Sequence, residues 1–198
     1  SKQILDKFAD YWNSYGNLGN FNIAFHPYPA PLEDPAFWTN SRGLVSDSIN
    51  TPCITMSNLS ILTNYVKQKW GSNTRIILSE QGFTSNRYGV NVPKIQAAAL
   101  AYAYYLAEFN TMVDAFILHR HVDHQAEMSI GLYLGLWSNN GSSSNPAAKG
   151  QKKDAWTVFK YMDTSKGAAK TKFALAHIGA SSWKSAVPGY NAARFQAY

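Results

Sequence analysis

Hydrophobic residues along the chain follow two alternating spacings, which predict helices and strands in turn. Apolar side chains recur every three or four residues in the segments that we expect to be helical. Short, nearly continuous apolar runs between them are typical of strands buried in a parallel sheet. The predicted helices cover residues 2–15, 57–70, 93–109 and 152–164, and the predicted strands cover residues 21–28, 75–83 and 113–121. This order predicts an α/β fold with parallel strands and right-handed crossovers.

Three residues mark the expected helix ends. Ser57 can cap the second helix because its hydroxyl can accept a hydrogen bond from a free backbone amide, and Gly71 can end that helix. Pro93 suits the first turn of the third helix, where no amide hydrogen is needed. A Pro-rich segment over residues 29–55 and a Gly/Ser/Asn-rich segment over residues 138–150 predict loops.

Polar and titratable side chains gather where the three predicted strands end. In chain order these residues are His26 and Tyr28, then Glu80, then His119, His121, Asp123 and His124. The carboxyl ends of parallel strands lie on one edge of a sheet, which is where such folds bind ligands. The sequence therefore predicts a pocket around Glu80.

Composition narrows the class of protein. The chain has 198 residues, of which 45% are hydrophobic, enough for one domain with a core. Charged residues make up 15%, below the usual quarter. The 6 Trp, 12 Tyr and 10 Phe suit either a surface that meets neutral polar ligands such as sugars or a large aromatic core.

Charge, cysteine content and hydropathy argue against several partners. The net charge is +6, yet the basic residues are scattered except in 149–153 and 166–172, and no nucleic-acid-binding signature is present. Cys53 is the single cysteine, which rules out a disulfide within the chain and suits an intracellular or a secreted protein. No apolar run reaches about 18 residues, so we expect no membrane span.

Four segments, "AFHPYP", "ILSEQGF", "FILHRH" and "GLYLGLW", resemble the last three strands of a (β/α)8 glycoside hydrolase of the large retaining clan. More specifically, the chain resembles an uncharacterised group of bacterial hydrolase-like barrel proteins. The resemblance implies a single domain over 1–198, the second half of a TIM-type (β/α)8 barrel, with barrel units over 1–165 and a C-terminal extension over 166–198. It further implies an oligo- or polysaccharide substrate, no cofactor, and a bacterial secreted or periplasmic enzyme.

The same resemblance assigns roles to individual residues. Glu80 matches the nucleophile, His26 and Tyr28 match a His-x-Tyr pair at the preceding strand end, and Trp137 matches the tryptophan that floors the sugar site. The other expected substrate-binding residues are Trp38, His119, His121, Asp123 and Glu127. The clan's acid/base Glu usually follows Asn, and no Asn-Glu dipeptide occurs here. Either the absent first half of the barrel supplies that Glu, or this mechanism does not operate.

Other interpretations of the same residues stay open. Glu80 could be a structural carboxylate paired with Arg87 or Arg120. The string "HRHVDH" over 119–124 matches the His-x-His-x-Asp-His pattern that binds two zinc ions in the metallo-β-lactamase fold. Against a zinc site, no Gly-rich helix start follows and few later ligands exist, which favours a hydrogen-bond network in which Glu127 balances the imidazoles. The chain could also be a non-catalytic carbohydrate-binding barrel. A half barrel alone would be inactive and would need its partner half or self-association to cover its open edges.

Overall fold

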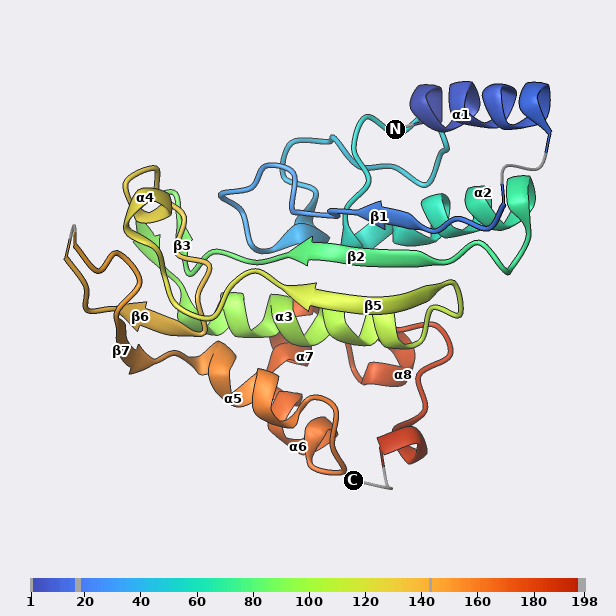
Figure 1. Ribbon diagram of the computed structural model, residues 1–198. Helices are drawn as coiled ribbons and strands as arrows, with labels where there is room; N and C mark the ends of the chain where they lie inside the picture. Colours follow the sequence, from blue (N-terminus) through green and yellow to red (C-terminus); the bar gives the residue numbers. More distant parts are fainter. Residues whose placement is uncertain (1, 17–18, 143, 196–198) are drawn as a thin grey trace.

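The strands form one parallel sheet and two small antiparallel ribbons. The computed structural model describes residues 2–16, 19–142 and 144–195 (Figure 1). The parallel sheet has the order β1 (Ile23–Phe25), β2 (Ile76–Gln81) and β5 (Val113–Leu118). The ribbons pair β3 (Asn86–Arg87) with β4 (Val90–Asn91), and β6 (Trp137–Asn139) with β7 (Lys149–Lys152). The predicted α/β class with parallel strands is confirmed.

The helices follow the strands in the expected alternation. The α-helices are α1 (Lys2–Tyr15), α2 (Leu59–Trp70), α3 (Pro93–Glu108), α4 (Gln125–Met128), α5 (Asp154–Tyr161), α6 (Gly167–Thr171), α7 (Phe173–Ile178) and α8 (Trp183–Ala186). Short 3-10 turns occupy η1 (Phe37–Thr39), η2 (Met56–Asn58) and η3 (Ala192–Phe195). None of the helices in the described segments combines the length and apolar character needed to cross a membrane.

Two of the three predicted helix ends are confirmed. Gly71 follows the last residue of α2 with φ of 83°, a conformation that favours glycine, and its amide donates to the carbonyl of Lys67 at 2.9 Å. Pro93 begins α3. The prediction for Ser57 is wrong, because Thr55 caps η2, the turn that leads into α2: its hydroxyl accepts from the Ser57 amide, while the Thr55 amide donates to Asn58.

One face of the parallel sheet is packed against helices, and the other face is uncovered in the described chain. Ile76 and Leu78 of β2 are fully buried in the core that α2 and α3 share. The residues that alternate with these buried ones along each strand point to the opposite face of the sheet. Ala24 of β1 is exposed on that side, and Ile117 of β5 exposes 51% of its surface. The sheet therefore has a single packed face.

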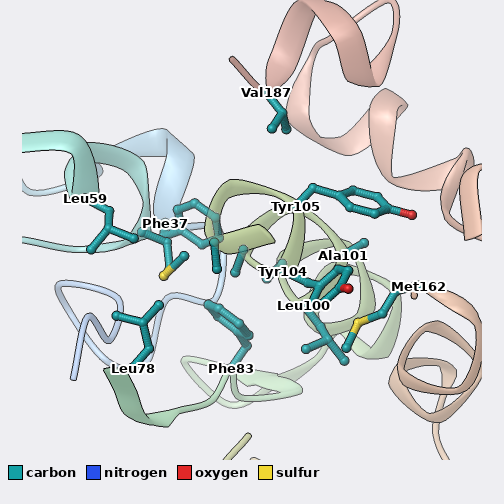
Figure 2. Close-up of a cluster of buried hydrophobic side chains, with 14 of the residues drawn as sticks. Phe37, Leu59, Leu78, Phe83, Leu100, Ala101, Tyr104, Tyr105, Met162 and Val187 are labelled. Carbon is teal, nitrogen blue, oxygen red and sulfur yellow. The ribbon is translucent and has the colours of Figure 1, made fainter. Parts of the chain in front are cut away.

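Helix α3 forms the centre of the core. Its alanines at 97–99, 101, 103 and 107 are buried, and they allow β5, α5 and α7 to pack closely against it. Figure 2 shows Tyr104 and Tyr105 of α3 near Met162, with Phe83 on the other side. Its many small side chains explain why one helix can contact so many elements.

Residues 166–195 pack back onto α3. The Trp183 indole donates to the Thr171 hydroxyl at 3.0 Å, and that hydroxyl also lies 3.3 Å from the Tyr105 hydroxyl. Ala174 and Phe195 belong to the same hydrophobic cluster as α3. Residues 166–195 thus share the core of the preceding helices and strands.

Candidate functional site

The carboxyl ends of the three parallel strands lie on one side of the molecule, beside α4 and β3 (Figure 1). Ile76 to Leu78 pair in register with Ile23 to Phe25, so residues just beyond these stretches meet at the sheet edge. This topology brings His26 and Tyr28 to Glu80 from one neighbour, and His119 from the other. The expected convergence of strand ends on Glu80 is present.

Glu80 receives contacts from both neighbouring strand ends. The Tyr28 hydroxyl donates to Glu80 Oε1 at 2.9 Å. His26 Nδ1 lies 3.4 Å from Oε2, and His119 Nδ1 lies 3.4 Å from Oε1. The Glu80 side chain remains 37% exposed, so a ligand can reach it. The carboxylate is thus oriented by three groups and still accessible.

The arginines expected as alternative partners of Glu80 bind other carboxylates. Arg87 pairs with Asp34 at 2.9 Å. Arg120 Nε lies 3.5 Å from Glu127 Oε2. Among the described residues, the ion-pair partners of Glu80 are His26 and His119. The geometry therefore gives no support to an arginine-paired structural carboxylate.

A second carboxylate approaches the site through an imidazole. Glu127 lies in α4, and its Oε1 is 2.7 Å from His119 Nε2. The start of α4 is fixed by His124, whose Nδ1 accepts the Ala126 amide at 3.3 Å. Because His119 lies between Glu80 and Glu127, a protonated ring can donate one N–H to each of them. His119 therefore links Glu127 to Glu80.

Gly82 allows the third strand to approach Glu80. The His119 amide donates to the Gln81 carbonyl at 2.7 Å, which draws the end of β5 against β2. A Cβ atom at position 82 would lie 2.0 Å from the His119 carbonyl oxygen. Only glycine leaves room for this contact, which accounts for the order Glu80, Gln81, Gly82 after a buried strand.

Burial keeps Tyr28 in its donor form. Desolvation and, secondarily, the hydrogen bond to Glu80 raise the pKa of Tyr28 well above its ordinary value of 10. Its phenol therefore stays protonated at physiological pH and donates to the carboxylate. The hydroxyl therefore helps to fix the orientation of the Glu80 carboxyl group.

Asp123 belongs to a separate, buried ion pair. Its Oδ1 lies 2.9 Å from Lys153 Nζ and accepts the Gly135 amide at 2.6 Å. Lys153 also donates to the Ser85 hydroxyl and the Tyr133 carbonyl. Burial raises the pKa of Asp123 and lowers that of Lys153, against the opposing effect of their mutual attraction. This pair joins segments of the fold and makes no described contact with Glu80.

The two tryptophans predicted to stack on a sugar pack against other aromatic rings. Trp38 packs on Phe37 and Tyr102, with ring centroids 5.4 and 6.2 Å apart. Trp137 lies in β6, with its ring against Trp156 at 6.2 Å. Their predicted sugar-stacking roles gain no support from these positions.

The side chains of "HRHVDH" contact different partners. His119 meets Glu80 and Glu127, Asp123 pairs with Lys153, and His124 caps α4, whereas His121 is exposed. The described residues contain no group of three His, Cys, Asp or Glu side chains arranged to hold a metal ion. The residues of the zinc-like string are therefore not assembled into one site.

Sequence patterns missed some residues that shape the site. Ser79 lies 3.0 Å from His26 Nε2 and orients that ring from inside β2, although a serine in a strand is unremarkable in sequence. Lys153 belongs to the lysine-rich segment 149–153, and nothing in that sequence distinguishes Lys153 from its exposed lysine neighbours. A hollow of about 430 Å³ lies beside Lys153 and is not lined by Glu80.

Comparison with known proteins gives one family. Residues 1–186 match the sequence model described as "Family of unknown function (DUF5722)". No curated protein and no solved structure matches the chain.

Proposed function

The chain belongs to the family of unknown function DUF5722, and we propose that it forms the half of a carbohydrate-active (β/α)8 hydrolase that carries the catalytic nucleophile. The observation that carries the proposal is Glu80, an accessible carboxylate at the end of a central strand, bonded to Tyr28 and flanked by His26 and His119. An oriented, accessible carboxyl group of this kind suits nucleophilic attack on an anomeric carbon.

The one-sided sheet supports the half-barrel part of the proposal. A closed barrel would cover the face that carries Ala24 and Ile117, and would pair the outer edges of β1 and β5. In the described chain β1 and β5 each pair with β2 alone. The remaining strands of such a barrel would come from another segment or another copy.

The proposed reaction proceeds in two steps. A Glu80 oxygen attacks the anomeric carbon, the glycosidic C–O bond breaks, and the leaving oxygen takes a proton from a carboxylic acid. Water then attacks the glycosyl ester, gives its proton to the same group, and releases Glu80. Glu127 is separated from Glu80 by His119, so we assign the proton donor to the remainder of the barrel. Within this chain His26 and Tyr28 hold Glu80 in place.

Covalent trapping tests the proposal directly. The whole protein containing this chain is incubated with a panel of dinitrophenyl 2-deoxy-2-fluoroglycosides, which accumulate the glycosyl ester of a retaining enzyme. Peptide mass spectrometry should find the label on Glu80. On aryl glycosides without fluorine, Glu80→Gln should lower kcat/KM by about 10³-fold or more, because the attacking group is lost.

Glu33, an exposed glutamate outside the cluster, provides the control. Glu33→Gln should keep the wild-type rate. A label on another residue, or equal rates for Glu80→Gln and wild type, would remove Glu80 from catalysis. A protein that binds oligosaccharides but never hydrolyses or traps them would be the non-catalytic binding barrel.

A further inference from the structure

Lysines and aromatic rings alternate along one outer surface of the molecule. The surface runs from the β6–β7 ribbon along α5 to α6, elements that follow one another in Figure 1. We call it the lysine–aromatic strip, and its members in spatial order are Lys149, Trp137, Lys152, Trp156, Lys160, Tyr161 and Lys170.

Each ring of the strip lies beneath two ammonium groups. Over Trp137, Lys149 Nζ is 4.4 Å and Lys152 Nζ is 5.3 Å from the ring centroid. Lys152 is also 3.9 Å from Trp156, which Lys160 approaches at 5.3 Å. All these distances fall within the range of about 6 Å for cation–π attraction. The rings and ammonium groups therefore form one continuous row.

Tyr161 extends the row to α6. Its ring centroid lies 5.1 Å from Lys160 Nζ and 5.4 Å from Lys170 Nζ. The two lysine-rich segments of the sequence, 149–153 and 166–172, are thereby joined through α5. Basic residues that are scattered in sequence thus form one surface.

Carboxylates of the described chain do not neutralise the positive charge of the strip lysines. Residues 149–172 contain seven lysines and two aspartates. Asp163 accepts a hydrogen bond from Tyr104 at 2.7 Å, and Lys153 is the lysine paired with Asp123. In the part of the chain that the structure describes, no strip lysine lies within ion-pair distance of a carboxylate. The row presents positive charge to solvent and favours an anionic ligand.

The chemistry of the strip favours an acidic polysaccharide over a nucleic acid. Single-stranded nucleic-acid sites combine a basic groove with bare aromatic faces on which the bases stack. Here ammonium groups already lie over the ring faces, which leaves no bare face for a base. A row of ammonium point charges suits carboxylate or sulfate groups repeated along a sugar chain.

A backbone hydrogen bond connects the strip to the segment that follows β5, which also carries His119. The Trp137 amide donates to the His121 carbonyl at 3.1 Å, and His121 is two residues from His119. We propose that the lysine–aromatic strip binds an acidic polysaccharide and holds it next to the strand-end site. The binding role stands on the strip itself, while the identification of this polymer as substrate rests on the proposed function.

Binding measurements test the proposal with hydrolysis removed. The Glu80→Gln protein is titrated at physiological salt with polygalacturonate, dextran sulfate, neutral dextran and single-stranded DNA, and binding is followed calorimetrically. At least one acidic polysaccharide should bind more tightly than dextran and DNA. Replacing Lys149, Lys152, Lys160 and Lys170 together by Gln should weaken that binding by about tenfold or more. Because Glu80 is already substituted, failure of its catalytic role leaves this result unaffected.

A charge-matched control separates the strip from net charge. Lys7, Lys67, Lys94 and Lys184 are exposed and lie on other elements, and their joint replacement by Gln removes the same charge. This control should retain binding within about twofold. Three outcomes would overturn the proposal. The strip and control variants could lose binding equally, DNA could bind more tightly than both acidic polysaccharides, or neutral dextran could bind as tightly as the acidic ones. Circular dichroism of each variant verifies that the fold is kept.

Discussion

At the residue scale, the candidate site depends on one close backbone contact. Gly82 admits the His119 carbonyl into the space that a Cβ would fill, and this contact sets how near His119 comes to Glu80. A glycine required by close approach differs from one required by a turn. Gly43, with φ of 62° and open space around it, is of the second kind.

We predict that Gly82→Ala displaces His119 and destabilises the fold by about 1–3 kcal/mol, the usual cost of forcing a methyl group into a packed site. Urea denaturation measures the free energy of unfolding, and NMR spectra of the histidine rings report the displacement. The control Gly43→Ala should cost about 1 kcal/mol through backbone strain and leave the His119 ring signals in place. Unchanged His119 signals in Gly82→Ala would contradict this account.

At the element scale, the Asp123–Lys153 pair connects the end of β5 with the start of α5. Lys153 immediately precedes α5, and its contacts to Ser85 and Tyr133 add two further segments. Raising the pKa of Asp123 contributes stability that is fully present below its ordinary value of 3.8 and is lost as pH rises through the raised pKa. Lowering the pKa of Lys153 contributes stability above its ordinary 10.5 that is lost as pH falls through the lowered pKa. At pH values between the two pKa values, the ion pair fixes the relative positions of these segments without raising the free energy of unfolding.

We therefore predict opposite outcomes for breaking and for replacing this pair. Lys153→Met alone should lower the free energy of unfolding at neutral pH by about 3–5 kcal/mol, because Asp123 stays buried and unpaired. Adding Asp123→Asn should recover most or all of that loss. Urea denaturation of wild type and the three variants gives the complete cycle. Arg75→Met, which breaks the partly exposed pair with Asp114, should cost less than about 1 kcal/mol. A double variant as unstable as Lys153→Met would refute the assignment.

Sequence periodicity predicted the long helices well, because each carries apolar residues at helical spacing. The segment 2–15 matches α1, and 93–109 differs from α3 by its last residue. The β6–β7 ribbon was missed because its sequence, Trp137–Asn139 and Lys149–Lys152, is short, polar and separated by a Gly/Ser/Asn loop. Such ribbons are fixed by tertiary contacts more than by local propensity.

The candidate site was predictable where strand order alone decided it. His26, Tyr28, Glu80 and His119 follow consecutive parallel strands, so topology brings them together. The placement of Asp123 could not be predicted, because its partner Lys153 is distant in sequence and resembles the exposed lysines around it. Pairings across long loops leave no periodic trace in a single sequence.

At the scale of the whole molecule, the uncovered sheet face is the main unsatisfied surface. Ile117 is half exposed on that face, and β1 and β5 form its two edges in the described chain. Exposed strand edges beside apolar residues favour pairing with another chain. This arrangement is what the half-barrel proposal requires of an unassembled half.

We predict that residues 1–198 alone self-associate as protein concentration rises, which sedimentation velocity can follow. Ile117→Lys should shift the population toward monomer, because it places a charge on the contact face. Ile130→Lys substitutes an even more exposed isoleucine, 70% accessible, that lies after α4 and outside the sheet. This control should leave self-association unchanged. Monomers at every concentration, or equal effects of both substitutions, would show that the sheet face is not an interface.

The alanines of α3 have a consequence for how this chain can evolve. Ala97, Ala98 and Ala99 are fully buried between the sheet and the later helices, so almost any substitution adds volume where none is free. Random mutagenesis would thus find very few acceptable replacements along this helix, even though it contributes no residue to the Glu80 cluster. Drift in family members should accumulate elsewhere, and this stretch should change least for reasons of space alone.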